Sequence, residues 1–401
     1  MIKQRLESVL HKRCTLLGVG PMSLNCVNAV IELANEHLVP IILIASRRQI
    51  DSEKFGGGYV NNWTTEGFAD YVIDNDKNGR VILARDHGGP WQNACEKEAS
   101  LSLRRAMESA KSSFRADIES GFQVLHIDPT VDIYGTPSLD EVLDRIFELY
   151  EYCWAQAQRL GVEILFEIGT EEQSGSTNTQ EELEYTLKSM RRFCDRNSIP
   201  FPSFVVVQTG SRVIEKRNVG SFDSPIRIMD ELPAEIQVPK MIEICNRNQI
   251  FMKAHNTDYL SDEALKWYPR LGIHSANVAP EFGVAETLAL LNLMEEQGME
   301  DLAQRFLRLA YDSNKWCKWI LPDNHINDRD CAVIAGHYIF ATEECKEIKL
   351  EVQSRIHSKS IDLEDFLKEC VKESIMRYLS QTQKWRKSCC LGVYLLLLMS
   401  K

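Results

Sequence analysis

The run Pro40-Ile-Ile-Leu-Ile-Ala45 is apolar throughout and leads directly into the polar residues Ser46 to Gln49. An uninterrupted apolar run of this length is typical of a strand that is buried on both faces. Further runs share this design, and each is followed by a polar or glycine-containing loop and then by a helical pattern. They are Cys14–Val19, Arg80–Arg85, Gly121–Ile127, Val162–Ile168, Ser203–Gln208, Ile250–Ala254 and Gly272–Val278.

The alternation of buried strands and helices predicts a parallel α/β fold. Eight such units within about 280 residues match a (β/α)₈ TIM barrel, whereas a doubly wound open sheet, the alternative, normally has fewer strands. Two of the helices carry N-terminal capping signals, Ser138 with Glu141 and Thr179 with Glu182. We therefore assign residues 1–290 to the barrel. The largely helical residues 291–401 are expected to form an all-α C-terminal extension packed on it.

Charge and hydropathy restrict the possible partners. The formal net charge of −12 argues against a nucleic-acid or anionic-membrane binder, because such partners require an excess of Lys and Arg. The first residues lack the apolar core of a secretory signal, so we expect a cytoplasmic protein. The apolar run Leu391–Met399 is too short to cross a bilayer. The cysteines form no C-x-x-C pair, which argues against a zinc knuckle.

Polar residues that end the predicted strands are the candidate site, because TIM barrels place their chemistry at the C-terminal ends of the strands. Histidines and carboxylates converging on one rim would suit a divalent metal such as Zn²⁺, although each alone could be an ordinary strand-end residue. The residues concerned are Asp86, His87, His126, Asp128, Glu167, His255, Asp258 and Glu281.

Arg47 and Arg48 follow the second strand and precede the glycine-rich loop Gly56–Tyr59. The forked donors of arginine suit a phosphate group, so these residues predict anion binding at the rim. The alternative is a solvated pair of loop arginines. The glycines do not end in the Lys-Ser/Thr of a P-loop, and no dinucleotide-binding fingerprint is present, so neither a nucleotide nor a nicotinamide cofactor is indicated.

Several of these segments together resemble the Z-type subunit of D-tagatose-1,6-bisphosphate aldolase, over residues 46–291 and more loosely to residue 378. The family is related to class II fructose-bisphosphate aldolases, which are metal-dependent barrels that cleave or form the C3–C4 bond of a ketose phosphate. Its Z-type members are described as non-catalytic partners of an aldolase subunit, and relatives are credited with 4-epimerisation. The segments are Gly57–Tyr59, Asp86–Trp91, His126–Asp128, Glu167 with Glu171 and Gly175, and Ala254–Tyr259.

The resemblance implies roles for four residues. Asp86 matches the acid that moves the hydroxyl proton, and His87 and His255 match metal ligands. Glu167 matches the carboxylate of strand five near the metal and is also a candidate catalytic residue. We therefore expect His87 and His255 to approach each other at the barrel mouth, with Glu167 beside them. Strand six departs from the class II pattern, because Gln208 begins a Gln-Thr-Gly-Ser run where the pattern places a third histidine.

Two functions follow from the resemblance. The first is an enzyme of ketose phosphate metabolism that performs metal-dependent retro-aldol cleavage or 4-epimerisation, and the second is a stabilising subunit that binds a catalytic class II aldolase. The expected partners are a phosphorylated sugar, in the second case an aldolase subunit, and further copies of the chain as a homo-oligomer. The candidate substrate-binding residues are Ser46, Arg47, Arg48, Gly57, Tyr59, His126, Asp128, Gln208, Asp258 and Glu281.

Overall fold

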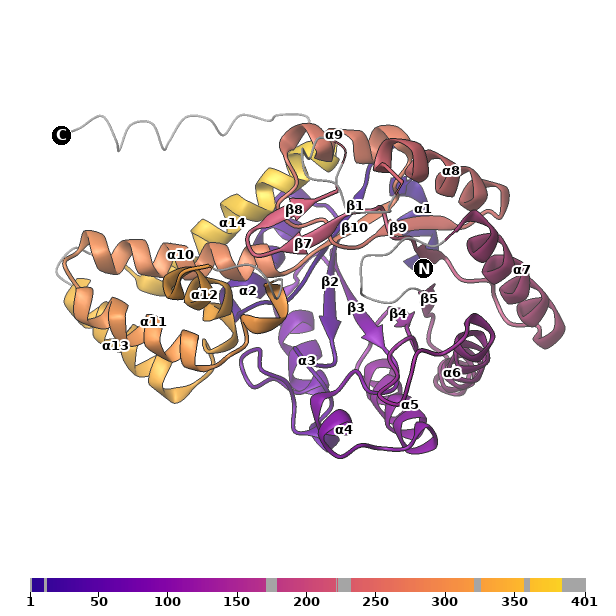
Figure 1. The fold of residues 1–401 in the computed structure, drawn as a ribbon, viewed down its shortest axis with the longest axis horizontal. Coiled ribbons are helices and arrows are strands. Elements are labelled where there is room, and N and C mark those ends of the chain that lie inside the picture. Colours follow the sequence, from indigo (N-terminus) through magenta and orange to yellow (C-terminus); the bar gives the residue numbers. More distant parts are fainter. Residues whose placement is uncertain are drawn as a thin grey trace.

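The computed structural model describes residues 2–10, 13–170, 179–220, 222, 232–320, 326–356 and 361–383. Eight parallel strands form a closed barrel in the order β1-β2-β3-β4-β5-β6-β9-β10, with β10 pairing back to β1 (Figure 1). The (β/α)₈ fold predicted from the sequence is confirmed. The strands are β1 Leu16–Val19, β2 Ile41–Ser46, β3 Val81–Gly88, β4 Val124–Ile127, β5 Leu165–Ile168, β6 Phe204–Val206, β9 Phe251–Ala254 and β10 Ser275–Val278.

Helices follow the strands and cover the outside of the barrel. Both predicted capping boxes form, since the Ser138 and Thr179 hydroxyls accept from the backbone N–H groups of Glu141 and Glu182, whose carboxylates accept in return. The helices are α2 Leu24–His37, α3 Thr65–Asn75, α4 Ala94–Glu98, α5 Leu103–Glu119, α6 Leu139–Leu160, α7 Gln180–Asn197, α8 Ala234–Arg247 and α9 Asp262–Leu271.

Helix α1, Ile2–Leu10, packs against the apolar interior at the N-terminal end of the barrel. Its side chains Ile2, Leu6 and Leu10 are buried with inward-facing strand residues such as Ile82 and Val124. The apolar packing at this end leaves the opposite, C-terminal end of the strands for polar side chains.

The C-terminal helices form a lobe beside the barrel (Figure 1). Its last helix, α14, begins in the lobe core at Leu363 and ends in the barrel core at Tyr378, where it packs against α2 and α9. The boundary expected at residue 290 falls inside α10, and α14 serves as an outer barrel helix. The elements are α10 Pro280–Glu296, α11 Glu300–Asp312, α12 Asp328–Ala335, α13 Glu343–Ile356 and α14 Leu363–Thr382, with 3₁₀ turns η2 Cys317–Trp319 and η3 Gly336–Tyr338.

A two-stranded hairpin, β7 Arg212–Ile214 and β8 Arg217–Val219, follows β6. The backbone N–H of Glu215 in its turn donates to the carbonyl of Trp319 at 2.9 Å, so the hairpin contacts the lobe. Within the described ranges, no helix combines the length and the apolar content that crossing a membrane requires.

Candidate metal centre

Four side chains from four different strands meet inside the mouth of the barrel. They are Asp86 on β3, His126 on β4, Glu167 on β5 and His255, which directly follows β9. One oxygen or nitrogen atom from each lies within 4.8 Å of the others. Two imidazoles and two carboxylates are a ligand set that Zn²⁺ and similar divalent ions accept.

Strand geometry explains why these residues converge. Successive side chains of a strand point to opposite faces, so the apolar neighbours of Glu167, Phe166 and Ile168, pack outward while Glu167 points inward. The register pairs His126 directly with Glu167 on the neighbouring strand. The same alternation brings Lys253 and His255 of the β9 segment to the inside.

The atoms of the cluster fit a cation. Glu167 Oε2 accepts a hydrogen bond from Lys253 Nζ at 2.6 Å, whereas Glu167 Oε1 is buried without a hydrogen-bond partner. That free oxygen lies 3.6 Å from both His126 Nδ1 and His255 Nε2. An unpartnered buried carboxylate oxygen is costly unless an ion or a water satisfies it. The geometry therefore supports a bound cation beside Oε1.

Hydrogen bonds also reach the two imidazoles. The backbone N–H of His87 donates to His126 Nδ1 at 3.2 Å. The Asn277 amide lies 3.1 Å from His255 Nε2 and donates to Asp86 Oδ1 at 3.2 Å. These are long hydrogen bonds, so a cation facing the same lone pairs would displace weak contacts rather than strong ones.

Electrostatics favour the protonation states that ligands need. Burial opposes ionisation of Glu167, but Lys253 and then His126 outweigh it and lower its pKa to about 2. Burial likewise opposes ionisation of Asp86, yet the neighbouring histidines, His87 first, hold its pKa well below the usual range. Burial lowers the pKa of His255 to about 4. At neutral pH the cluster therefore offers carboxylates and a neutral imidazole.

His87 lies beside this cluster. It has a left-handed backbone, with φ of +46°, at an irregularity where the register of β3 with β4 shifts. Its ring centroid is 5.0 Å from that of His255, and its Nδ1 lies 2.6 Å from Asp128 Oδ2. Burial disfavours the charged ring, but Asp86 and Asp128 outweigh it and raise the pKa of His87 to about 9. That His87 is itself a ligand stays a prediction.

The two arginines after β2 differ sharply. Arg47 is buried and pairs with Asp51 at 2.9 Å and with Glu96 at 2.7 Å, so its guanidinium is already engaged and does not suit the phosphate contact we expected. Arg48 is exposed. Its carbonyl accepts from the backbone N–H of Tyr59 at 3.2 Å, which ties the arginine to the glycine-rich loop that contains Gly57.

Other residues that we expected to bind the substrate lie at the rim, where they form hydrogen bonds with neighbouring loop residues. Ser46 contacts the Gln49 side chain, and Gln208 accepts from Asn256 at 3.2 Å. Asp258 accepts from the backbone N–H groups of Ala279 and Glu281 at 3.0 and 2.9 Å.

Asp258 and Glu281 also differ from ordinary surface carboxylates. Burial, and next the charge of Glu281, raise the pKa of Asp258 to about 7. Glu281 itself accepts from the Tyr378 hydroxyl of α14. Glu171, Gly175 and the run Leu391–Met399 lie outside the described residues.

Sequence reasoning missed two inward-facing residues, Lys253 and Asn277. Lys253 is buried and pairs with Glu167. The signal was present, because a lysine in the apolar run Phe251-Met-Lys-Ala254 shares the inward parity of His255. Asn277 has the same position in the β10 run, between the outward-packed Ala276 and Val278.

Comparison with known proteins gives a family and a fold. Residues 10–315 match the family model described as D-tagatose-1,6-bisphosphate aldolase subunit GatZ/KbaZ-like. A probable tagatose 6 phosphate kinase of Sinorhizobium meliloti 1021 superposes with a TM-score of 0.73 at 17% identity, over 92% of this chain and 100% of that one. Among curated proteins, none matches the sequence.

Two further solved structures share the fold. The fructuronate-tagaturonate epimerase UxaE of Cohnella laeviribosi has a TM-score of 0.59 at 11% identity, over 92% of this chain and 81% of that one. The fructose-bisphosphate aldolase of Campylobacter jejuni has a TM-score of 0.55 at 12% identity, over 95% of this chain and 93% of that one.

Proposed function

This chain belongs to the GatZ/KbaZ-like family of D-tagatose-1,6-bisphosphate aldolase subunits, and from that premise we propose that it is a metal-dependent enzyme acting on ketose phosphates. The proposed reaction is reversible cleavage of the C3–C4 bond, or inversion at C4 when the same fragments rejoin. The observation that carries the proposal is the buried set of Asp86, His126, Glu167 and His255 around one centre.

Burying this set of ionisable side chains is energetically unfavourable. Glu167 and His126 are almost fully buried, with side-chain exposures of 1% and 2%. Removing ionisable side chains from water costs free energy that the barrel could avoid with apolar residues. Clusters of buried, mutually perturbed ionisable groups are typical of functional sites. An active role for the mouth explains why the fold tolerates the cluster.

Asp86 is the residue we assign to proton transfer. Its side chain is 12% exposed, more than those of Glu167 and His126, so a substrate entering the mouth can reach it. In the cleavage direction, an Asp86 oxygen accepts the proton of the C4 hydroxyl, the C4 carbonyl forms, and the electron pair of the C3–C4 bond moves towards the C2 carbonyl. In the reverse direction Asp86 returns the proton.

Neighbouring residues hold Asp86 and Glu167 in place. Asn277 donates to Asp86 Oδ1, and His87 Nε2 lies 3.7 Å from Asp86 Oδ2, where its charge keeps the carboxyl ionised. Lys253 holds one oxygen of Glu167 and leaves the other facing the histidines. A divalent cation, for which we propose Zn²⁺, would be held by Glu167, His126 and His255, and would polarise the ketose carbonyl as a Lewis acid. His87 would be an alternative ligand only in its neutral form.

The test uses the purified protein alone. We expect it to bind one Zn²⁺ or Mn²⁺ per chain in a calorimetric titration and, once loaded, to cleave or epimerise at least one member of a panel of ketose phosphates. Both triose release and epimer formation should be followed. Glu167→Gln should lose the metal stoichiometry and the turnover together. Turnover that survives chelation and the Glu167 substitution would contradict the proposal.

A second candidate, a stabilising partner of a separate aldolase subunit, is favoured by strand six. Gln208 stands where the class II pattern has a histidine, and its amide oxygen already accepts from Asn256. An accessory protein would stabilise the catalytic subunit even when its own cluster is disrupted. Mixing the Asp86→Asn variant with a class II aldolase subunit and following the thermal inactivation of that subunit separates the two functions.

A further inference from the structure

Three basic side chains near the barrel mouth have no acidic partner within the described part of the chain. Arg48 follows β2, Lys97 belongs to α4 after β3, and Lys318 belongs to η2 of the helical lobe. Among the residues that the structure describes, no carboxylate lies within 4 Å of their charged groups, in contrast to Arg47 next door. Glu96, one of the two acids adjacent to Lys97 in sequence, is already paired with Arg47.

Aromatic contacts bring Lys318 of the lobe towards the Arg48 loop. Lys318 Nζ lies 4.6 Å from the ring centroid of Trp319 and 5.1 Å from that of Tyr338. The ring of Tyr338 lies 4.8 Å from the ring of Tyr59, whose backbone N–H donates to the carbonyl of Arg48. The lobe thus meets the loop after β2 at the C-terminal end of the barrel.

The Trp319 segment is held from a second side as well. The Trp319 carbonyl accepts a hydrogen bond from the backbone N–H of Glu215 in the hairpin after β6. The loop of Tyr59 is also joined to the lobe by Asn62, whose amide lies 3.4 Å from the carbonyl of Ala341. η2 therefore has a fixed position between two loops that begin at the barrel mouth.

Electrostatic influence links the three cations to each other and to the cluster. Burial and then the charge of Arg48 lower the pKa of Lys97, and the same two causes lower that of Lys318. Lys318 itself is exposed to solvent, so a ligand can reach it. Arg48 also disfavours the charged form of His87. An anion bound beside Arg48 and these lysines would offset this repulsion.

We propose that Arg48, Lys97 and Lys318 together bind the phosphate group of the ligand, so that the helical lobe supplies one wall of the site. The inference rests on the proposed function only in taking the phosphate to belong to a sugar. Arginine and lysine donors without acidic partners suit a phosphate because each adds a charge-assisted hydrogen bond. The lobe then has a binding role beyond packing on the barrel.

The test measures binding rather than turnover. Inorganic phosphate, D-fructose 6-phosphate and D-fructose are titrated into the full-length protein by calorimetry. We expect the two phosphorylated probes to bind, D-fructose to bind far more weakly, and Lys318→Gln and Arg48→Gln each to raise the Kd for both phosphorylated probes about tenfold. Lys318→Arg, which keeps the charge, should stay within about threefold of the native Kd.

Arg308→Gln is the matched control, because it removes one charge from an exposed position of the same lobe, on α11. Equal weakening by Arg308→Gln, native affinity of a folded Lys318→Gln protein, or no phosphate binding by the native protein would each overturn the inference. Phosphate binding that depends on Lys318 in a protein without turnover would support the inference and count against the enzyme function, so the two failures are distinguishable.

Discussion

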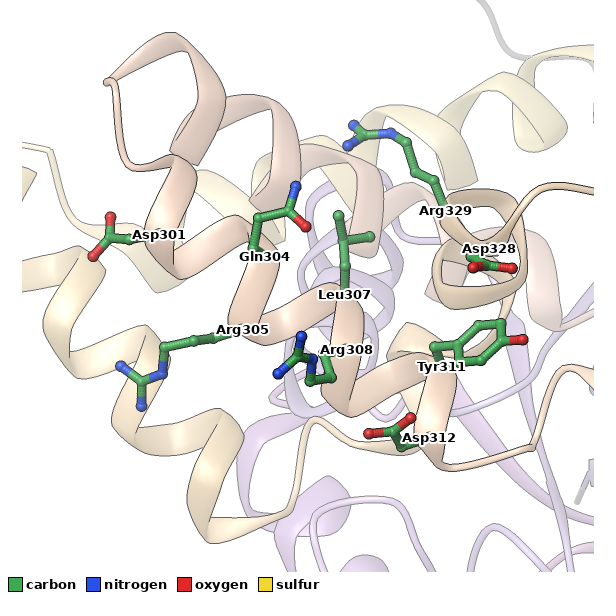
Figure 2. A pocket seen from close by; sticks show the side chains of 9 residues that line it. All are labelled: Asp301, Gln304, Arg305, Leu307, Arg308, Tyr311, Asp312, Asp328 and Arg329. Carbon is green, nitrogen blue, oxygen red and sulfur yellow. The ribbon is translucent and has the colours of Figure 1, made fainter.

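The barrel mouth and a cleft on the helical lobe are both lined by charged residues, but they are built in opposite ways. The cleft has a volume of about 490 Å³ and lies along α11 and α12. Figure 2 shows its charged side chains spreading outward along the helices instead of converging. Its lining residues are Asp301, Gln304, Arg305, Leu307, Arg308, Tyr311, Asp312, Asp328 and Arg329.

Several charges in the cleft are exposed and paired with neighbours on the surface. Asp301 pairs with Arg355 and Arg305 with Glu351, and their side-chain exposures are 58% and 50%. Such pairs contribute little, because water screens them. In the mouth, Glu167 is 1% exposed and keeps an unpartnered oxygen. Burial and convergence of ionisable groups therefore mark the candidate site, whereas the volume of a cleft does not.

The largest expected effect is on turnover, and it distinguishes a carboxylate of the barrel mouth, Asp86, from a carboxylate of the cleft, Asp301. Asp86→Asn should reduce turnover about 10²–10⁴-fold, because the amide cannot accept the substrate proton. Asp301→Asn in the cleft should leave turnover unchanged. Steady-state kinetics on the metal-loaded proteins gives the comparison, and equal losses in the two variants would remove the distinction between the regions.

The second-largest expected difference between the mouth and the cleft is in the free energy of unfolding. Lys253→Met leaves the Glu167 charge buried without its partner, which typically costs about 3–5 kcal/mol. Arg355→Met removes the partner of Asp301 on the exposed surface and should cost much less. Urea unfolding measures both. The double variant Lys253→Met/Glu167→Gln should recover most of the loss, because the unpaired charge is gone.

The absence of that recovery would point to lost packing of Lys253 rather than to the lost charge. It would therefore contradict the view that Lys253 acts by neutralising Glu167.

The pH dependence of stability should have opposite signs in the two regions. The pKa of Asp258 is raised from 3.8 to about 7. Between these values the folded protein holds a proton that the unfolded chain has lost, so this group's contribution to stability falls as the pH rises from about 4 to about 7. Asp258→Asn should flatten that slope in unfolding experiments.

Asp301 provides the contrast within the cleft. Its hydrogen bond with Arg355 lowers its pKa below 3.8, so its contribution is present above that value and is lost as the pH falls further. Asp301→Asn should therefore leave the slope between pH 4 and 7 intact. An unchanged slope in the Asp258→Asn protein would show that other groups control the pH response of the rim.

The smallest effect is expected in the cleft alone. Arg305→Gln breaks an exposed pair with Glu351 and should change the free energy of unfolding by about 1 kcal/mol or less. Turnover and metal stoichiometry should stay at native levels. A clear loss of activity in this variant would give the cleft a function that its exposed, paired charges do not indicate.

The barrel could be predicted from the sequence alone. Every predicted strand contains or overlaps an observed one. A strand that is buried on both faces needs apolar side chains at successive positions, and such a short apolar run can be recognised in the sequence. The sequence also predicted which residues lie at the rim of the barrel mouth. The four residues of the cluster each stand at or near the C-terminal end of such a run, namely Asp86, His126, Glu167 and His255. Closure of the barrel then brings those ends together, whatever the loops contain.

The neighbours of these residues, in contrast, could not be predicted from the sequence. His87 lies at the irregularity in β3 and contacts Asp128, whereas His126 and His255 face Glu167, and spacing along the chain cannot show this. Arg47 and Arg48 are adjacent in sequence, yet one is buried against two acids and the other is exposed. The partners that distinguish such residues come from distant segments, and their contacts exist only once the chain has folded.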